Sequence, residues 1–191
     1  MFERSRHFFQ EFNAIFARHR AEAVEKYTDN TAFTDFIIGK INDVILSMGA
    51  CPQNEYFRID ASGYTSRYSE PKTVKGFHGH CWDLESAVEH ENDPADWLNE
   101  VVKLAHICCP LRVVIGYVPM GLRPAEDWVR LDCAADALQL LACRDNVRRG
   151  EFLIILGNSS TKGTPENFFH YRAYALDTAT FRFTELEDPY A

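Results

Sequence analysis

The spacing of apolar residues predicts two helices before the first strand. Within residues 2–27, Phe8 and Phe12 lie four positions apart, and further apolar residues continue the same helical spacing. A second apolar stripe with helical spacing starts after Thr31 and stops at Gly49, a residue type that often ends helices. We therefore expect one helix over residues 2–27 and another that begins at Thr31 and ends at Gly49.

The next two segments carry the alternation that is typical of half-buried strands. Residues 55–62 (EYFRIDAS) alternate with a period of two, which puts Asp60 on the less apolar face of a strand. A turn-rich and basic stretch follows, and a second strand begins near Cys81. On that strand we expect one face to hold Trp82, Leu84, Ser86 and Val88, and the other to hold Asp83, Glu85, Ala87, Glu89 and Glu91.

The rest of the chain predicts helices and buried strands in turn. Asp93-Pro94 is a strong helix start, because Asp caps free amides and proline suits the first helical position; this helix should reach about Ile107. The remaining expected elements are a strand at 111–118 that is covered on both faces, a helix at 131–148, a strand at 151–156, and a hairpin over 168–186 that turns near Asp177. This order predicts one α/β domain over residues 1–191, with helices flanking a mixed β-sheet.

Composition supports a folded domain and narrows its surroundings. The chain is 46% hydrophobic and 13% aromatic, which is enough for a substantial core. No run approaches the 18 or more apolar residues of a membrane span, and the charged, aromatic start is unlike a secretory signal, so we expect a cytoplasmic protein with no membrane partner. The six cysteines form no CxxC pair and are expected to be reduced. A net charge of −8 argues against broad electrostatic attachment to nucleic acid, although a local basic groove is compatible with it.

Acidic residues are concentrated where the second strand ends. Residues 83–100 contain seven carboxylates and no Lys or Arg. Alternate residues of a strand lie about 7 Å apart on one face, so Glu89 and Glu91 can converge, and Asp60 joins them if the two strands are neighbours. Oxygen ligands of this kind, with open positions for water, suit Mg²⁺ or Mn²⁺. The alternative is a solvated acidic sheet surface that binds nothing.

An Asp on one strand, two acids separated by one residue on the next, then a helix and a buried strand resembles the PD-(D/E)XK nucleases. The resemblance covers residues 31–118 and implies a restriction-endonuclease-like mixed sheet. The resemblance implies that Asp60 and Glu89 are metal ligands. Glu91 falls at the position that a lysine usually holds in this family, although some restriction endonucleases use glutamate there. In some members a lysine of the following helix replaces the missing one, and Lys103 lies on the expected helix. The plainer interpretation of Lys103 is a solvated partner of Glu100 at i,i+3.

Two functions follow as expectations. The first is a Mg²⁺- or Mn²⁺-dependent nuclease that hydrolyses phosphodiester bonds of DNA, with Asp60, Glu89 and Glu91 as metal ligands and Lys103 as a catalytic candidate. The second is an inactive nuclease-like scaffold that binds a protein in a defence or DNA-processing complex; a homodimer is also compatible with the resemblance. Basic residues between the two strands would line a groove for phosphates or simply form a solvated loop: Arg67, Lys72 and Lys75.

Overall fold

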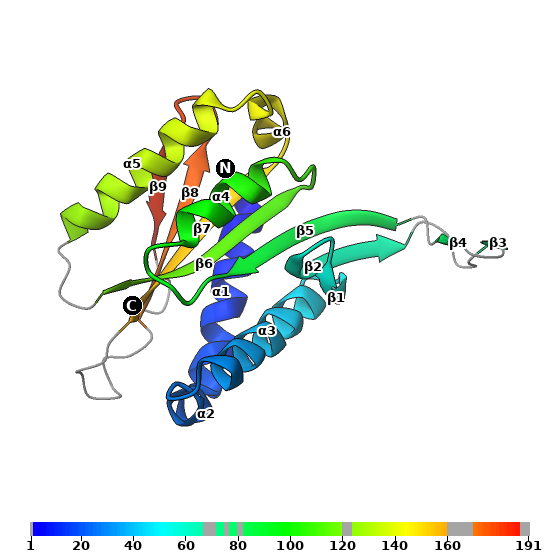
Figure 1. Cartoon of the computed structure of the whole chain (residues 1–191), viewed down its shortest axis with the longest axis horizontal. Coiled ribbons are helices and arrows are strands. Elements are labelled where there is room, and N and C mark those ends of the chain that lie inside the picture. The colour runs from blue at the N-terminus through cyan, green and yellow to red at the C-terminus, as the bar shows by residue number, and fades with distance from the viewer. Residues whose placement is uncertain are drawn as a thin grey trace.

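A seven-stranded mixed sheet forms the centre of the computed structural model, which describes residues 2–66, 72–74, 77–79, 82–119, 124–159 and 170–187 (Figure 1). The strand order is β1-β2-β5-β6-β7-β8-β9. The three central strands β5, β6 and β7 are parallel, and the outer pairs are antiparallel. The strands are β1 (Cys51–Tyr56), β2 (Ile59–Ser66), β5 (Trp82–His90), β6 (Leu111–Pro119), β7 (Glu151–Ser159), β8 (Tyr171–Asp177) and β9 (Arg182–Leu186), while β3 (Lys72–Val74) and β4 (Phe77–Gly79) pair separately. The expected α/β class and mixed sheet are confirmed.

Helices cover both faces of the sheet (Figure 1). On one face lie α1 (Glu3–Arg18), α2 (Arg20–Lys26) and α3 (Asn30–Ser47), and on the other lie α4 (Trp97–Ala105), α5 (Pro124–Leu140) and α6 (Arg144–Arg148). Each layer has its own apolar core. Along β6, Val113 packs into the core under α1 and α3, and the next residue, Val114, packs into the core under α4 and α5. The apolar run at 111–118 is therefore a strand covered on both faces, as predicted.

The predicted helices are present, but several of their ends differ from the prediction. The helix expected to start at Asp93-Pro94 and to reach about Ile107 begins at Trp97 and ends at Ala105. The stretch expected as one helix over 2–27 is divided at His19, whose φ of −112° lies outside the helical region. The next helix begins after Asp29, which accepts hydrogen bonds from two backbone amides of the first turn, and Gly49 follows its end with a φ of 81°. The helix expected over 131–148 begins earlier, at Pro124, and is interrupted before α6.

The prediction of one continuous strand over residues 55–62 is wrong. This segment is a hairpin: β1 ends at Tyr56, Phe57 and Arg58 form the turn, and β2 begins at Ile59. A two-residue hairpin turn of type I′ needs positive φ at both central positions, which Asn-Gly supplies most easily. Here Phe57 and Arg58 adopt φ angles of 52° and 62°, so the sequence carries none of the usual turn residues.

A β-bulge changes the side-chain alternation of β5. Gly63 of β2 pairs with Ser86, but Tyr64 pairs with Leu84, so one extra residue lies on β5. As a result Leu84 packs against the core under α4, whereas Val88 packs against the core under α1. The expectation that Leu84 and Val88 share a face is therefore wrong.

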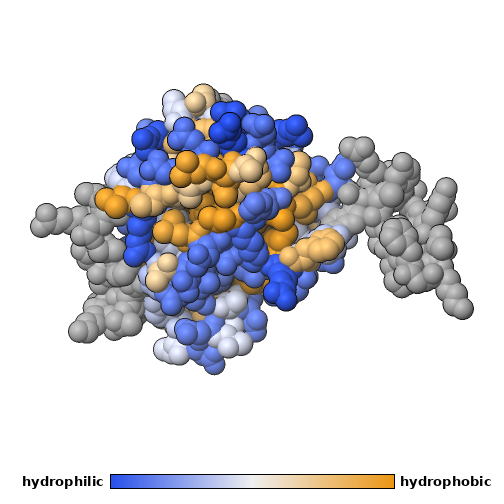
Figure 2. Space-filling model, turned by 45° about the horizontal axis from the view of Figure 1, so that its top comes forward, coloured by the Kyte–Doolittle hydropathy of each residue, from blue (hydrophilic) through white to orange (hydrophobic). Residues whose placement is uncertain are grey.

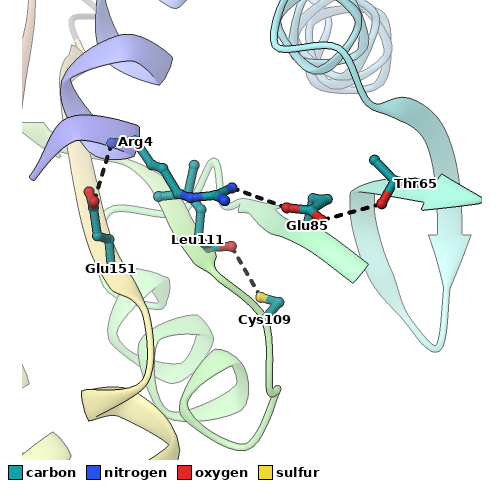
Figure 3. Close-up of polar contacts among 6 residues, drawn as sticks. All are labelled: Arg4, Thr65, Glu85, Cys109, Leu111 and Glu151. Carbon is teal, nitrogen blue, oxygen red and sulfur yellow. Dashed lines mark hydrogen bonds and ion pairs between the residues drawn. The ribbon is translucent and has the colours of Figure 1, made fainter. Parts of the chain in front are cut away.

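Polar contacts attach α1 to the sheet next to the bulge, at Glu85 of β5 (Figure 3). Glu85 of β5 accepts a hydrogen bond from Arg4 at 3.1 Å and one from Thr65 of β2 at 3.3 Å. The carboxylate of Glu151 on β7 accepts from the backbone amides of Arg4 and Ser5, at 3.2 and 2.7 Å. An acidic group at these free amides is favourable both as a cap and towards the helix dipole.

Apolar side chains also reach the surface. Figure 2 shows a face on which they gather in a band between polar margins. Among the described residues, the large apolar side chains that are exposed are Leu46, Phe57, Val129 and Leu140, and Phe57 is the one aromatic residue of that set. Within the same described ranges, no helix combines the length and the apolar character needed to cross a membrane.

Candidate functional site at the carboxyl end of β5

Neighbouring strands bring Asp60 and Glu89 together. Strands β2 and β5 pair in antiparallel register, with Ala61 opposite Val88, so the next residue on each strand is Asp60 and Glu89. Val88 faces the core under α1, and the alternation therefore turns Glu89 towards α4. The backbone amide of His90 donates a 2.8 Å hydrogen bond to Oδ2 of Asp60, which holds that carboxylate against the end of β5.

Helix α4 adds a lysine to the two acids. Nζ of Lys103 lies 2.8 Å from Oε1 of Glu89 and 3.0 Å from Oε2 of Glu100. Glu89 is almost completely buried, with 1% of its surface exposed. The sequence left open whether Lys103 reaches the acidic strand or pairs with Glu100 on its own helix, and its ammonium group does both.

Burial controls the protonation of the two carboxylates. Removal from water raises the pKa of Glu89 to about 8, and the nearby charge of Asp60 acts in the same direction, while the hydrogen bond to Lys103 opposes it. The pKa of Asp60 is also raised by burial, against the lowering effects of the His90 amide and of Lys103. Burial lowers the pKa of Lys103, but its hydrogen bonds to Glu89 and Glu100 outweigh this and leave it raised. The site therefore keeps a positive lysine beside carboxylates that resist ionisation.

One acid near the site was not predicted from the sequence. Asn54 pairs with Ala61 and Tyr56 pairs with Ile59, so Glu55 lies opposite Asp60 in the β1–β2 ladder. Its charge contributes to the raised pKa of Asp60. Recognition of Glu55 would have required the hairpin turn at residues 57–58, because a continuous strand over 55–62 carries Glu55 away from Asp60.

Glu91 has a different environment from the other two predicted ligands. Strand β5 ends at His90, and Oε1 of Glu91 accepts a 2.8 Å hydrogen bond from the amide of Asp93 in the turn that leads to α4. In the described part of the chain, no three or more His, Cys, Asp or Glu side chains are grouped so that they could hold a metal ion. The geometry thus brings Asp60 and Glu89 together as a pair and gives Glu91 a local role in the turn.

His90 lies on the opposite face of the sheet from Glu89. It is buried, and Nε2 is 3.0 Å from the hydroxyl of Tyr117, which is 3.3 Å from the hydroxyl of Tyr171. Burial lowers the pKa of His90 to about 3, so its ring is neutral near physiological pH. These contacts anchor the residue whose amide holds Asp60.

Comparison with known proteins does not assign the chain to a family. No family model matches the chain, and no curated protein matches it in sequence. The expected basic groove also has no structural description, because Arg67 and Lys75 lie outside the described residues and only the backbone of Lys72, on β3, is described. The chemistry of the site therefore depends on its own residues.

These residues fit a weakly held cation better than a closed metal cage. Mg²⁺ accepts one or two protein carboxylates and keeps several waters, and Asp60 and Glu89 are the two carboxylates that could act as such ligands. A buried carboxylate with a pKa near 8 is also a group that gains from a nearby cation, since the positive charge offsets the cost of ionisation. Lys103 supplies part of that compensation in the structure.

Proposed function

We propose that this protein is a divalent-metal-dependent nuclease that hydrolyses phosphodiester bonds of nucleic acid. The observation that carries the proposal is the contact of Lys103 Nζ with Glu89 Oε1 at 2.8 Å, beside Asp60 on the neighbouring strand. A lysine from α4 therefore stands next to the two acids, which compensates for the absence of lysine at position 91. The order of Asp60 on β2, Glu89 on β5, then α4 and β6 is also the order on which the resemblance to PD-(D/E)XK nucleases depends.

Each residue has a distinct role in this proposal. Asp60 and Glu89 would hold Mg²⁺ or Mn²⁺, which when bound supplies a Lewis acid that polarises the phosphodiester and lowers the pKa of an attacking water. The amide of His90 fixes the carboxylate of Asp60. Lys103 keeps a positive charge next to Glu89, where negative charge develops on the phosphate in the transition state.

A cleavage assay tests the proposal. Labelled single-stranded and duplex oligonucleotides of one sequence are incubated with the protein in Mg²⁺, Mn²⁺ or EDTA. We expect cleavage that EDTA abolishes, and a loss of about 100-fold or more for Asp60→Asn, Glu89→Gln and Lys103→Met. Lys40→Met is the matched control, because Lys40 also pairs with an acid at i,i+3, on α3. Full activity of Lys103→Met, or equal losses in Lys103→Met and Lys40→Met, would contradict the role given to Lys103.

A second function has its own supporting observation. The positive charge of Lys103 already compensates Glu89 and Glu100 within the protein, and Glu91 binds a backbone amide. An acidic site whose charges are satisfied internally would suit a scaffold that has lost metal binding and contacts a protein partner. Absence of cleavage together with absence of Mn²⁺ binding would favour this function over the nuclease.

A further inference from the structure

The turn between β1 and β2 has a backbone conformation that its residues do not favour. Tyr56 pairs with Ile59, so the turn consists of Phe57 and Arg58 alone, with φ angles of 52° and 62°. Glu55, two residues before Phe57, has a φ of 55°. Glu55, Phe57 and Arg58 are three of the five non-glycine residues with positive φ in the described ranges. Left-handed backbone is unfavourable for L-residues with side chains, and Asn-Gly would form the same turn without this cost. Strain of this kind tends to persist at sites that bind ligands.

The strained turn presents an aromatic ring to solvent. Phe57 is 78% exposed, although burial of such a side chain is one of the main sources of stability in a folded protein. Its ring meets that of Tyr56 edge-on, with 4.4 Å between centroids and 77° between planes. This contact orients the ring of Phe57, and the exposed side chain of Arg58 adds a positive charge beside it.

The turn also lies next to the candidate site. Phe57 precedes Asp60 by three residues, so their backbones are separated by at most about 10 Å. In stacked DNA one strand rises about 3.4 Å per nucleotide, so no more than about three nucleotides are needed to cover this separation. A base held at Phe57 would therefore place phosphates of the same strand near Asp60 and Glu89.

We propose that Phe57 and Arg58 form a platform that binds one unpaired nucleotide, with the base stacked on the ring of Phe57 and the adjoining phosphate bound by Arg58. Aromatic side chains bind single strands in this way because every base has a face that stacks. In a duplex both faces of each base are already stacked, so the platform selects single-stranded nucleic acid or an unpaired end. The inference rests on the proposed function, since it names the substrate of that same site.

Binding of a fluorescein-labelled oligothymidylate of about 12 nucleotides tests the platform. The measurement is made in EDTA by fluorescence anisotropy, so that neither cation binding nor cleavage enters it. We expect Phe57→Ala to weaken binding by about 10-fold or more and Phe57→Trp to restore it. Leu140→Ala is the matched control, because Leu140 on α5 is a similarly exposed apolar residue, with 85% of its surface exposed. A duplex of the same length should bind more weakly and without dependence on Phe57.

A second variant separates binding from folding. Phe57→Asn combined with Arg58→Gly gives the turn its preferred residues, so we expect the melting temperature to rise by a few degrees while oligonucleotide affinity falls. Wild-type affinity in this variant, or absence of single-strand binding by the wild type, overturns the platform.

The two proposals fail in different ways. Single-strand binding that depends on Phe57, without any metal-dependent cleavage, would refute the proposed nuclease activity and leave the platform standing. Metal-dependent cleavage and oligonucleotide binding that are both unchanged in Phe57→Ala would refute the platform and leave the nuclease proposal standing. Preferential binding of the duplex would overturn the platform and leave the nuclease proposal in place.

Discussion

Replacement of Glu89 by Gln should make the protein more stable at high pH. Glu89 is buried, and its pKa is raised from 4.5 to about 8 in the folded protein. Below pH 4.5 the carboxyl is protonated in both the folded and the unfolded chain. As the pH rises, the unfolded chain releases this proton first, so the free energy of unfolding falls until the folded protein also ionises near pH 8.

The size of the effect follows from the difference between the two pKa values. Between 4.5 and about 8, at about 1.36 kcal/mol per pH unit, the ionised carboxyl costs at most roughly 5 kcal/mol. Gln removes this cost but still buries a polar group, and it leaves Lys103 paired with Glu100 alone. Because these losses are present at both pH values, we expect Glu89→Gln to increase the free energy of unfolding by about 2 kcal/mol at pH 8 and to lower it by about 2 kcal/mol at pH 4.5.

Urea denaturation followed by tryptophan fluorescence measures this difference at the two pH values. Glu85→Gln on the same strand is the control: it loses a partly exposed ion pair with Arg4, so it should lower stability by at most about 1 kcal/mol. A Glu89→Gln variant that is less stable than the wild type at pH 8, or equally altered at both pH values, would refute the reasoning. In that case the ion pair with Lys103 would outweigh the burial of the charge.

Three further predictions concern other parts of the molecule. Asp29→Ala removes the cap of α3 and should lower the free energy of unfolding by about 1 kcal/mol in urea denaturation; Asp29→Ser, which keeps a cap, should lose less. Gly116→Ala places a Cβ 2.7 Å from the Cβ of Trp97, so overpacking should cost about 1 to 3 kcal/mol, and an unchanged melting temperature would show that α4 can move away. Glu91→Gln should bind Mn²⁺ as the wild type does in calorimetric titration, because Glu91 accepts from the amide of Asp93; a large loss would instead support the three-carboxylate site predicted from the sequence.

The sequence predicts those parts of the fold in which pattern and burial agree. Val113 and Val114 lie in an apolar run between prolines, and that run is a strand buried on both faces. The sequence places Asp60 beside Glu89 if their two strands are neighbours, and β2 and β5 do pair, with the bulge away from both residues. Strand alternation also accounts for His90, which follows Glu89 and contacts Tyr117 on the opposite face.

The parts that the sequence does not predict depend on backbone features without a residue signature. The turn at Phe57 has no glycine or asparagine, so the hairpin looks like one strand and the position of Glu55 opposite Asp60 is lost with it. The bulge opposite Gly63 shifts Leu84 to the other face without any change in the pattern of apolar residues. The reach of Lys103 to both Glu89 and Glu100 depends on the packing of α4 on β5, which no local spacing determines.

Calorimetric titration with Mn²⁺ shows whether Asp60 and Glu89 bind one divalent cation. We predict that the wild type binds a single Mn²⁺ and that Asp60→Asn and Glu89→Gln each abolish this binding. Because Glu89→Gln is expected to be at least as stable as the wild type at pH 8, its loss of binding at that pH would not reflect unfolding. Equal binding by the wild type and both variants, or binding by none of them, would contradict this prediction.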